Sequence, residues 1–198
     1  MNLKKELMNN INKGIVDKQF ELCVDEPLDG VLHFNMLRKE FCTELIDQVE
    51  SADNWTDSRH DFYPTYDVLL KDFDNEFNLE YVKFMDTAIK PMLVDHFKLD
   101  GKMANNVWYY ECFVAKYSHE LQAKLDLHHD NADFASVLTL NDNYEGGGTY
   151  FARQKTLHKS KVGEMTLHPG KITHLHGGRP VTNGTRYILV TFMNVGEE

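Results

Sequence analysis

RYILVTFM, residues 186–193, is the last of a series of short runs that decides the fold of the second half of the chain. It is rich in β-branched and aromatic residues, which favour β-strands. Similar runs precede it and alternate with glycine: VWYYECFVAKY, FASVLTLN, GGGTYFA, GEMTLHPG and KITHLH. Repeated short strands that follow helices predict an antiparallel barrel or jelly roll backed by helices.

Helical patterns dominate the first half of the chain. Over residues 35–53 apolar side chains recur at a spacing of four, which is typical of an amphipathic helix. They are Leu37, Phe41, Leu45 and Val49. The pattern recurs over residues 79–99, where Pro91 should kink or split the helix and Gly101 should end it. Between them, residues 61–70 (DFYPTYDVLL) should be extended, because the residue before a proline is biased away from helix.

The length and composition fit a single globular domain. A chain of 198 residues with 42% hydrophobic content can bury one sizeable core. We therefore predict an α+β protein of one domain over residues 1–198. Helices of about residues 1–104 would support a β core of about residues 105–195.

Charge and cysteine content restrict the partners. The chain has 21 Lys+Arg against 31 Asp+Glu, and its formal charge of −10 would repel phosphate, so no nucleic-acid partner is expected. The cysteines Cys23, Cys42 and Cys112 lack CxxC spacing, which predicts buried thiols rather than a zinc knuckle or disulfide framework. The N-terminus lacks the apolar region of a signal peptide, and no run approaches a membrane helix. As given, the chain is expected to be cytoplasmic.

The stretch LDLHHDNADFAS, residues 125–136, holds the first candidate metal ligands. Residues two apart on a strand point to the same face, so His128 and Asp130 would project together while His129 turns away. One imidazole nitrogen and one carboxylate oxygen would thus converge.

A second stretch, THLHGGRP, residues 173–180, offers a third ligand. The same parity pairs His174 with His176, and either could complete the set. Two histidines and one carboxylate form the facial triad of non-haem Fe(II), which leaves positions open for substrate and dioxygen. Zinc accepts these ligand types too, but its structural sites usually close with cysteine or a fourth protein ligand, and no cysteine lies near.

Arg186 opens the otherwise apolar run quoted first. A buried guanidinium is costly unless it meets an anion, and a carboxylate can pair with it through two parallel hydrogen bonds. The partner would be either a bound carboxylate ligand or, in a purely structural role, an acidic side chain of the protein.

Taken in order, these segments resemble the iron- and 2-oxoglutarate-dependent dioxygenases, and most closely the catalytic domain of the procollagen lysyl hydroxylases. His128-x-Asp130 is followed by His176, and Arg186 lies ten residues further on. The similar segments are YPTYDVLL, FVAKY, LHHDNADF, NYEGGGTYF, LHPGKITHLHGG and PVTNGTRYILVTF. The resemblance covers about residues 60–194.

This resemblance implies a double-stranded β-helix, or jelly roll, flanked by N-terminal helices. It also implies Fe(II) held by His128, Asp130 and His176, with 2-oxoglutarate held by Arg186. The position of the family's ligand relative to its arginine selects His176 over His174. The implied reaction is hydroxylation of peptidyl lysine at C5 in collagen-like sequences with Lys-Gly, using O2 and 2-oxoglutarate, with ascorbate as reductant.

Some expectations remain open beside this one. Tyr117 could hydrogen-bond the cosubstrate or simply pack in the core. The activity could instead be that of another 2-oxoglutarate-dependent protein hydroxylase, such as a prolyl hydroxylase. A third hypothesis is a non-enzymatic metal-binding β-barrel in which Arg186 has only a structural role. We also expect a homodimer.

Differences from the family bear on the compartment. Thr149 replaces a family cysteine, and HGG replaces HEG. The missing thiol fits a non-oxidising compartment, as for a homologue from a large DNA virus. A fragment of a family member would instead lie in the endoplasmic reticulum lumen, within a longer polypeptide that carries sugar-transfer activity.

Charged residues and further histidines surround the predicted site. Acidic residues there could attract a cationic lysine: Asp126, Asp133 and Glu145. Three histidines suggest a second metal ion at a subunit contact: His119, His129 and His174. The remaining histidines are expected in turns, in packing or at the surface: His33, His60, His96, His158 and His168.

Overall fold

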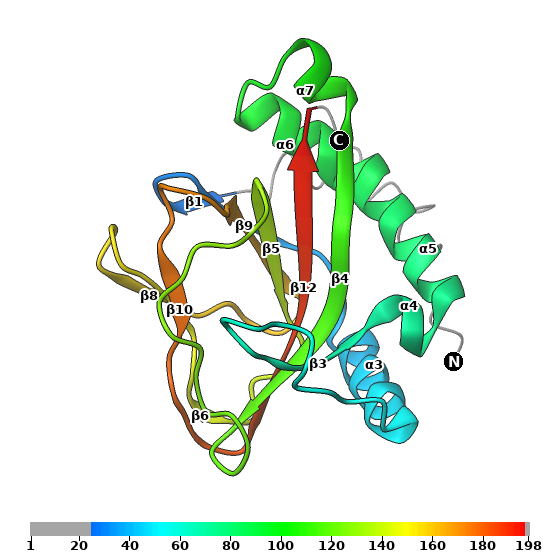
Figure 1. The fold of residues 1–198 in the computed structure, drawn as a ribbon, viewed down its shortest axis with the longest axis vertical. Helices are drawn as coiled ribbons and strands as arrows, with labels where there is room; N and C mark the ends of the chain where they lie inside the picture. Colours follow the sequence, from blue (N-terminus) through cyan, green and yellow to red (C-terminus); the bar gives the residue numbers. More distant parts are fainter. Residues whose placement is uncertain (1–24, 197–198) are drawn as a thin grey trace.

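The computed structural model describes residues 25–196, and its central element is a seven-stranded antiparallel sheet (Figure 1). The strand order is β1-β2-β9-β5-β12-β4-β3. The bounds are β1 (Asp25–Leu28), β2 (Val31–Asn35), β3 (Tyr66–Leu69), β4 (Val107–Ser118), β5 (Phe134–Thr139), β9 (Glu164–Pro169) and β12 (Thr185–Val195). The long strands β4 and β12 pair over almost their whole length, from Thr185↔Ser118 to Val195↔Val107.

Two small sheets complete the β structure. One has the order β10-β7-β8 and the other pairs β11 with β6. Their bounds are β6 (Glu145–Gly146), β7 (Thr149–Phe151), β8 (Thr156–His158), β10 (His176–Gly178) and β11 (Val181–Asn183). The described strands thus form three separate antiparallel sheets and do not close into one barrel. The run KITHLH is an exception to the predicted strands, because only its last residue, His176, enters a strand.

Helices cover one side of the large sheet, and the small sheets lie on the other side (Figure 1). The helices are α3 (Lys39–Ala52), α4 (Leu70–Phe73), α5 (Asn75–Phe84), the π-helical turn η2 (Met85–Ile89), α6 (Lys90–His96) and α7 (Gly101–Asn105). Helix α3 lies within the predicted range 35–53, and Phe41, Leu45 and Val49 of its predicted stripe are buried. Among the described residues, no helix is both long enough and apolar enough to cross a membrane.

The predicted helix over residues 79–99 is divided, as Pro91 suggested. Pro91 has no backbone N–H and its ring would clash with a carbonyl one turn earlier. The π turn of η2 ends at Ile89, two residues before Pro91, and changes the hydrogen-bond pattern there. Helix α6 then begins at Lys90 with Pro91 in its first turn. Gly101 does not end this helix, contrary to the prediction. Lys98 leaves the helical conformation with φ 51, and Gly101 begins α7.

The predicted division near residue 105 does not separate helices from strands. Strand β3 lies within the segment 61–70 that was expected to be extended, and it joins the sheet beside β4. Strands β1 and β2 were not predicted, and β2 pairs with β9. The rest of the predicted helical support, residues 1–24 with Cys23, lies outside the described residues.

The two faces of the large sheet contribute to two different clusters of buried side chains. Along β4 and β12, successive side chains point to opposite faces. Val114 and Leu189 belong to the apolar core under the helices. Their neighbours Phe113 and Ile188 belong to a second cluster on the other face. One face of the sheet therefore supports the helical layer, and the other is available to form a site.

Both described cysteines are buried free thiols, as the sequence predicted. Burial raises the pKa of Cys42 and of Cys112 to about 12. These thiols therefore stay protonated at neutral pH and act as small apolar side chains.

The helical layer should be a main source of stability. Replacing the fully buried Leu45 of α3 by alanine should lower the free energy of unfolding by about 2–5 kcal/mol, because it leaves a cavity under the sheet. Leu79 on α5 is 61% exposed, and Leu79→Ala should cost less than about 0.5 kcal/mol. Urea denaturation followed by circular dichroism measures both. Equal losses in the two variants would contradict this description of the core.

Candidate active site

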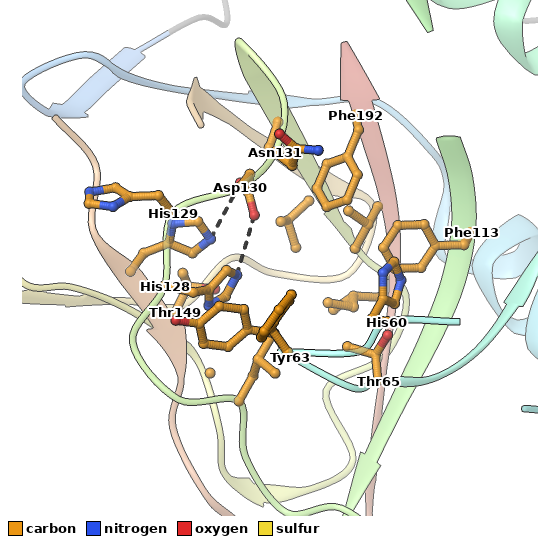
Figure 2. Close-up of a pocket in the computed structure, with 18 of the residues that line it drawn as sticks. His60, Tyr63, Thr65, Phe113, His128, His129, Asp130, Asn131, Thr149 and Phe192 are labelled. Carbon is orange, nitrogen blue, oxygen red and sulfur yellow. Dashed lines mark ion pairs between the residues drawn. The ribbon is translucent and has the colours of Figure 1, made fainter. Parts of the chain in front are cut away.

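The structure brings His128, Asp130 and His176 together on the face of the sheet away from the helices. Figure 2 shows His128 and Asp130 at this site. All three are buried, and their ligand atoms lie within 4.8 Å of one another. His128 Nε2 lies 3.3 Å from Asp130 Oδ1, and His176 Nε2 lies 3.6 Å from Asp130 Oδ2. Within the described part of the chain, no other group of histidine, cysteine and acidic residues has this geometry.

Backbone pairing holds the two histidines side by side. His128 lies outside the named strands but forms an isolated antiparallel bridge with His176, the first residue of β10. His128 N donates to His176 O at 2.8 Å, and His176 N donates to His128 O at 3.0 Å. The neighbouring Gly177 permits this approach, since a Cβ there would lie 2.8 Å from the Leu125 carbonyl oxygen.

Asp130 is fixed by a third backbone contact. Its N–H donates to Gly170 O at 3.0 Å, in the turn that follows β9. A side chain at Gly170 would collide with the Ala132 carbonyl oxygen and come within 3.0 Å of Asp130 Cβ. The position of the carboxylate therefore depends on a glycine far away in the sequence.

Hydrogen bonds to the backbone orient both imidazole rings. His128 Nδ1 lies 2.8 Å from Asp126 O, and His176 Nδ1 lies 2.8 Å from His174 O. Because a carbonyl can only accept, each Nδ1 carries a proton, and Nε2 is the ring atom that faces Asp130. Metal-binding histidines are usually oriented in this way.

The donor set fits a divalent cation. Asp130 Oδ2 is buried and has no hydrogen-bond partner among the described residues. An unsatisfied buried acceptor costs about 1–3 kcal/mol, and a cation at this point would remove that cost. Two imidazole nitrogens and one carboxylate oxygen are the ligands of the non-haem Fe(II) triad. The residues present therefore fit Fe(II).

Charge favours the same conclusion. Burial opposes ionisation of Asp130, but its hydrogen bond with His128 favours the carboxylate, and its pKa lies below its usual value. Burial lowers the pKa of His176, which keeps this imidazole neutral. Burial also lowers the pKa of the neighbouring His168, to about 3. Burial also opposes protonation of His128, but its hydrogen bond with Asp130 and the charge of that carboxylate favour the protonated ring, and the pKa of His128 is raised instead. A carboxylate and neutral imidazoles are the forms that bind metals, so a bound cation would take the place of the proton that His128 shares with Asp130.

Arg186 lies on β12, opposite Tyr117 on β4, and is 4% exposed. Its contacts are weak: Nη1 to Gly148 O at 3.4 Å, Nη2 to Thr149 Oγ1 at 3.5 Å, and none at Nε. No acidic side chain of residues 25–196 forms an ion pair with it, so the described residues provide no structural salt bridge. A buried guanidinium with so few partners favours a bound anion.

Tyr117 packs beside this guanidinium and faces the same cavity. Arg186 Cζ lies 5.9 Å from the centre of its ring. Burial raises the pKa of Tyr117 to about 12, so the phenol keeps its proton and can donate a hydrogen bond. The core-packing and ligand-binding roles predicted for Tyr117 are thus compatible in this position.

A single cavity of about 450 Å³ contains the three candidate ligands, Arg186 and Tyr117. Apolar side chains of the sheet form its floor: Phe113, Ala135, Val137, Ile188, Val190 and Phe192. An apolar cavity with a few convergent polar groups is the usual form of a small-molecule site. The candidate metal centre and the candidate anion site can therefore act on one bound ligand.

Part of the rim comes from residues 59–65, which overlap the segment 61–70 that the sequence predicted to be extended. The segment is anchored on the fully buried Asp67. Arg59 Nε lies 2.5 Å from Asp67 Oδ1, and the Thr65 hydroxyl donates to the other oxygen of Asp67. Arg59 also pairs with Glu111 at 3.5 Å. The only sequence signal for this rim was the similarity of YPTYDVLL to the family.

Two rim residues have positions that the sequence did not predict. His60 was expected to lie at the surface or in packing, but it lines the cavity. Tyr63 lies beside the three candidate ligands, with its ring centre 5.0 Å from that of His128 (Figure 2). Both belong to the segment before β3, so tertiary structure rather than local pattern brings them to the site.

The acidic residues expected to attract a cationic substrate do not line the cavity. Asp126 pairs with Lys124 at 2.6 Å and Asp133 pairs with Lys171 at 2.9 Å. Glu145 is exposed on β6. Their own partners and positions therefore direct them away from a substrate in the cavity.

The further histidines do not form a second cluster within residues 25–196. His174 has both ring nitrogens in hydrogen bonds, to Thr173 Oγ1 at 2.8 Å and to Asp29 O at 3.0 Å. His129 lines the cavity but turns away from the ligand set, as its parity predicted (Figure 2). His168 is fully buried, as expected for a core histidine.

Comparison with known proteins supports the resemblance seen in the sequence. The chain is 33% identical over 187 residues to the multifunctional procollagen lysine hydroxylase and glycosyltransferase of Caenorhabditis elegans. It is 33% identical over 190 residues to procollagen-lysine,2-oxoglutarate 5-dioxygenase 2 of Homo sapiens. Each match covers 88% of this chain. The chain is homologous to procollagen lysyl hydroxylases. It spans about a quarter of the length of these relatives, 25% of each.

Solved structures show the same fold at low identity. The match to the viral collagen prolyl hydroxylase of Paramecium bursaria Chlorella virus-1, in complex with 2OG, covers 85% of this chain and 97% of the viral one. Its TM-score is 0.56 at 16% identity. The match to a prolyl hydroxylase of Trichoplax adhaerens bound to a peptide fragment covers 98% of this chain and 89% of that one. Its TM-score is 0.60 at 15% identity. The fold is therefore that of the 2-oxoglutarate and Fe(II) oxygenases, which is a jelly roll. No protein-family model matches the chain.

The choice between His174 and His176 can be tested by metal binding. His176→Ala should abolish binding of Fe(II), or of Mn(II) as a redox-stable substitute, because it removes a ligand. His174→Ala should retain binding, since its ring nitrogens bind Thr173 and Asp29 instead. Anaerobic titration calorimetry on folded variants measures the affinity. Loss of binding in His174→Ala alone would reverse the assignment.

Proposed function

We propose that this chain is a Fe(II)- and 2-oxoglutarate-dependent hydroxylase that acts on C5 of peptidyl lysine in collagen-like sequences. The observation that carries the proposal is the shared cavity, which holds both the His128, Asp130, His176 cluster and the buried guanidinium of Arg186. Homology to procollagen-lysine 2-oxoglutarate 5-dioxygenases supports the choice of lysine.

Each residue has a role that follows from its position. His128, Asp130 and His176 would hold Fe(II), which supplies the activation of O2 when it is bound. Arg186 would bind the distal carboxylate of 2-oxoglutarate through two parallel hydrogen bonds. Tyr117, which stays protonated, would donate a further hydrogen bond to the cosubstrate. The apolar floor would exclude water and hold the substrate side chain.

The proposed reaction balances without further oxidants. Lysine, 2-oxoglutarate and O2 give 5-hydroxylysine, succinate and carbon dioxide. One oxygen atom enters the C5–H bond and the other enters the new carboxylate of succinate. Loss of carbon dioxide from 2-oxoglutarate supplies the two electrons that the reduction of O2 needs in addition to those from the C–H bond. Ascorbate would only restore the metal to Fe(II) after turnovers that oxidise it without substrate.

Three further properties of this chain are proposed from its resemblance to the lysyl hydroxylase family. Residues 1–198 would act as one catalytic domain, the substrate would be a collagen-like peptide with Lys-Gly, and the active form would be a homodimer. Mass photometry at working concentration would report the dimer, independently of activity.

A prolyl hydroxylase activity is the second candidate. The observation that favours it is the shared fold with a collagen prolyl hydroxylase and with a peptide-bound prolyl hydroxylase. At 16% and 15% identity this likeness concerns the fold alone. The sequence identity to lysyl hydroxylases is higher, at 33%. Lysine therefore remains the preferred substrate of the proposal.

Peptide hydroxylation separates the candidates. The chain should add one oxygen atom to the lysine of a collagen-like Lys-Gly peptide and form an equal amount of succinate. A matched peptide with proline-rich triplets and no lysine should remain unchanged. Fragmentation mass spectrometry locates the oxygen, and succinate is measured in parallel. Oxygen on proline alone would favour the second candidate, and turnover of neither peptide would favour a non-enzymatic metal protein.

Arg186 should control cosubstrate affinity. Arg186→Ala should weaken 2-oxoglutarate binding by at least about 100-fold, because a buried charge pair with two hydrogen bonds is lost. Metal affinity should stay within about twofold, since Arg186 is not a ligand. Arg179, which is exposed and stacks on Tyr150 with 4.2 Å from Cζ to the ring centre, provides the control variant Arg179→Ala. Unchanged 2-oxoglutarate turnover in Arg186→Ala would leave Arg186 a structural role.

A further inference from the structure

We infer that Asp61 recognises the ε-ammonium group of the substrate lysine, an inference that rests on the proposed lysyl hydroxylation. Asp61 belongs to the rim segment 59–65 and lines the cavity. The only other acidic side chain that lines it among the described residues is Asp130. Because Asp130 fits the metal, Asp61 is the carboxylate left to meet a cation.

The chemistry of lysine requires the cation to enter this cavity. In lysine a single carbon, C6, separates C5 from the ammonium nitrogen. When C5 faces the metal cluster, the ammonium group must therefore lie in the cavity or at its mouth. A charge removed from water in this way needs a partner of opposite sign, and the apolar floor offers none.

The other charges of the rim are already balanced. Arg59 lies 2.5 Å from Asp67 and 3.5 Å from Glu111, so two carboxylates surround its guanidinium. Asp61 forms no hydrogen bond or ion pair with any described residue, and it remains accessible to a ligand. Its carboxylate is thus an uncompensated negative charge at the mouth of the cavity. Such a charge attracts and orients a cationic side chain.

Two aromatic rings follow Asp61 directly. Phe62 is 90% exposed and Tyr63 is 42% exposed, although large apolar side chains are usually buried. Tyr63 lies next to the ring of His128, at 5.0 Å between ring centres (Figure 2). Aromatic faces can hold the methylene chain of lysine and also attract its ammonium group. The sequence Asp61-Phe62-Tyr63 therefore matches a side chain that is apolar along its length and cationic at its end.

Removing the charge of Asp61 tests the inference. Asp61→Asn should raise the KM for a collagen-like lysine peptide about tenfold, which corresponds to loss of one favourable ion pair. Turnover of 2-oxoglutarate without peptide should be unchanged, because this variant leaves the metal cluster and Arg186 intact. Asp57→Asn is the matched control: Asp57 is exposed, precedes the same rim and does not line the cavity. Its KM should equal that of the wild type.

A neutral substrate analogue shows whether the carboxylate reads the charge. A peptide with norleucine in place of lysine has nearly the same shape and no ammonium group. As a competitive inhibitor of the wild type it should bind about tenfold less tightly than the lysine peptide, and Asp61→Asn should bind the two peptides equally.

The outcomes distinguish this inference from the proposed function. If the wild type hydroxylates lysine but Asp61→Asn keeps the wild-type KM and the preference for lysine over norleucine, Asp61 is not the recognition residue and the proposed function stands. If the wild type hydroxylates only proline, the proposed function fails and the inference fails with it. Circular dichroism of each variant confirms that it is folded before the kinetics are compared.

Discussion

The candidate site depends on one short piece of antiparallel pairing, the two backbone hydrogen bonds between His128 and His176. At 2.8 and 3.0 Å these bonds place residues 48 positions apart directly opposite each other. Both rings then project to the same side, and each is fixed by a carbonyl at its Nδ1. Asp130 needs only the backbone hydrogen bond to Gly170 to complete the cluster. The geometry of the cluster is therefore set by the main chain, which leaves the side chains little rotational freedom.

Strands β4 and β12 connect this cluster to the rest of the fold. Their alternation gives Val114 and Leu189 to the helical core and gives Phe113 and Ile188 to the cluster on the cavity side. A shift of one residue in their register would exchange these faces and bury the cavity floor under the helices. The pairing continues from Thr185↔Ser118 to Val195↔Val107 with only one irregularity, so the register is fixed by many contacts at once. The same apolar packing that stabilises the sheet also determines where Arg186 points.

The sequence predicted the parts of this structure that depend on local pattern. The stripe of α3, the division at Pro91 and the strand character of residues 107–117 and 186–193 follow from periodicity and residue type. Strand parity predicted that His128 and Asp130 converge, but spacing alone left His174 and His176 equally suitable as the third ligand. Long-range contacts were not predictable in this way: strands β1 and β2 lack a strong pattern and depend on pairing with β9. The rim likewise depends on a buried Asp67, whose partners are set by tertiary structure.

The arrangement of charges explains why the protein keeps costly buried groups. Asp130 and Arg186 have opposite charges and line one cavity, yet they do not pair with each other. Each instead keeps an atom without a hydrogen-bond partner among the described residues, Oδ2 of Asp130 and Nε of Arg186. An unsatisfied buried polar atom lowers stability by about 1–3 kcal/mol, which is a large fraction of the free energy of unfolding of a typical domain. Two such atoms facing one apolar cavity are best explained by ligands that satisfy both, a cation at one and an anion at the other. A keto acid that chelates a metal ion and extends a second carboxylate meets both requirements with one molecule.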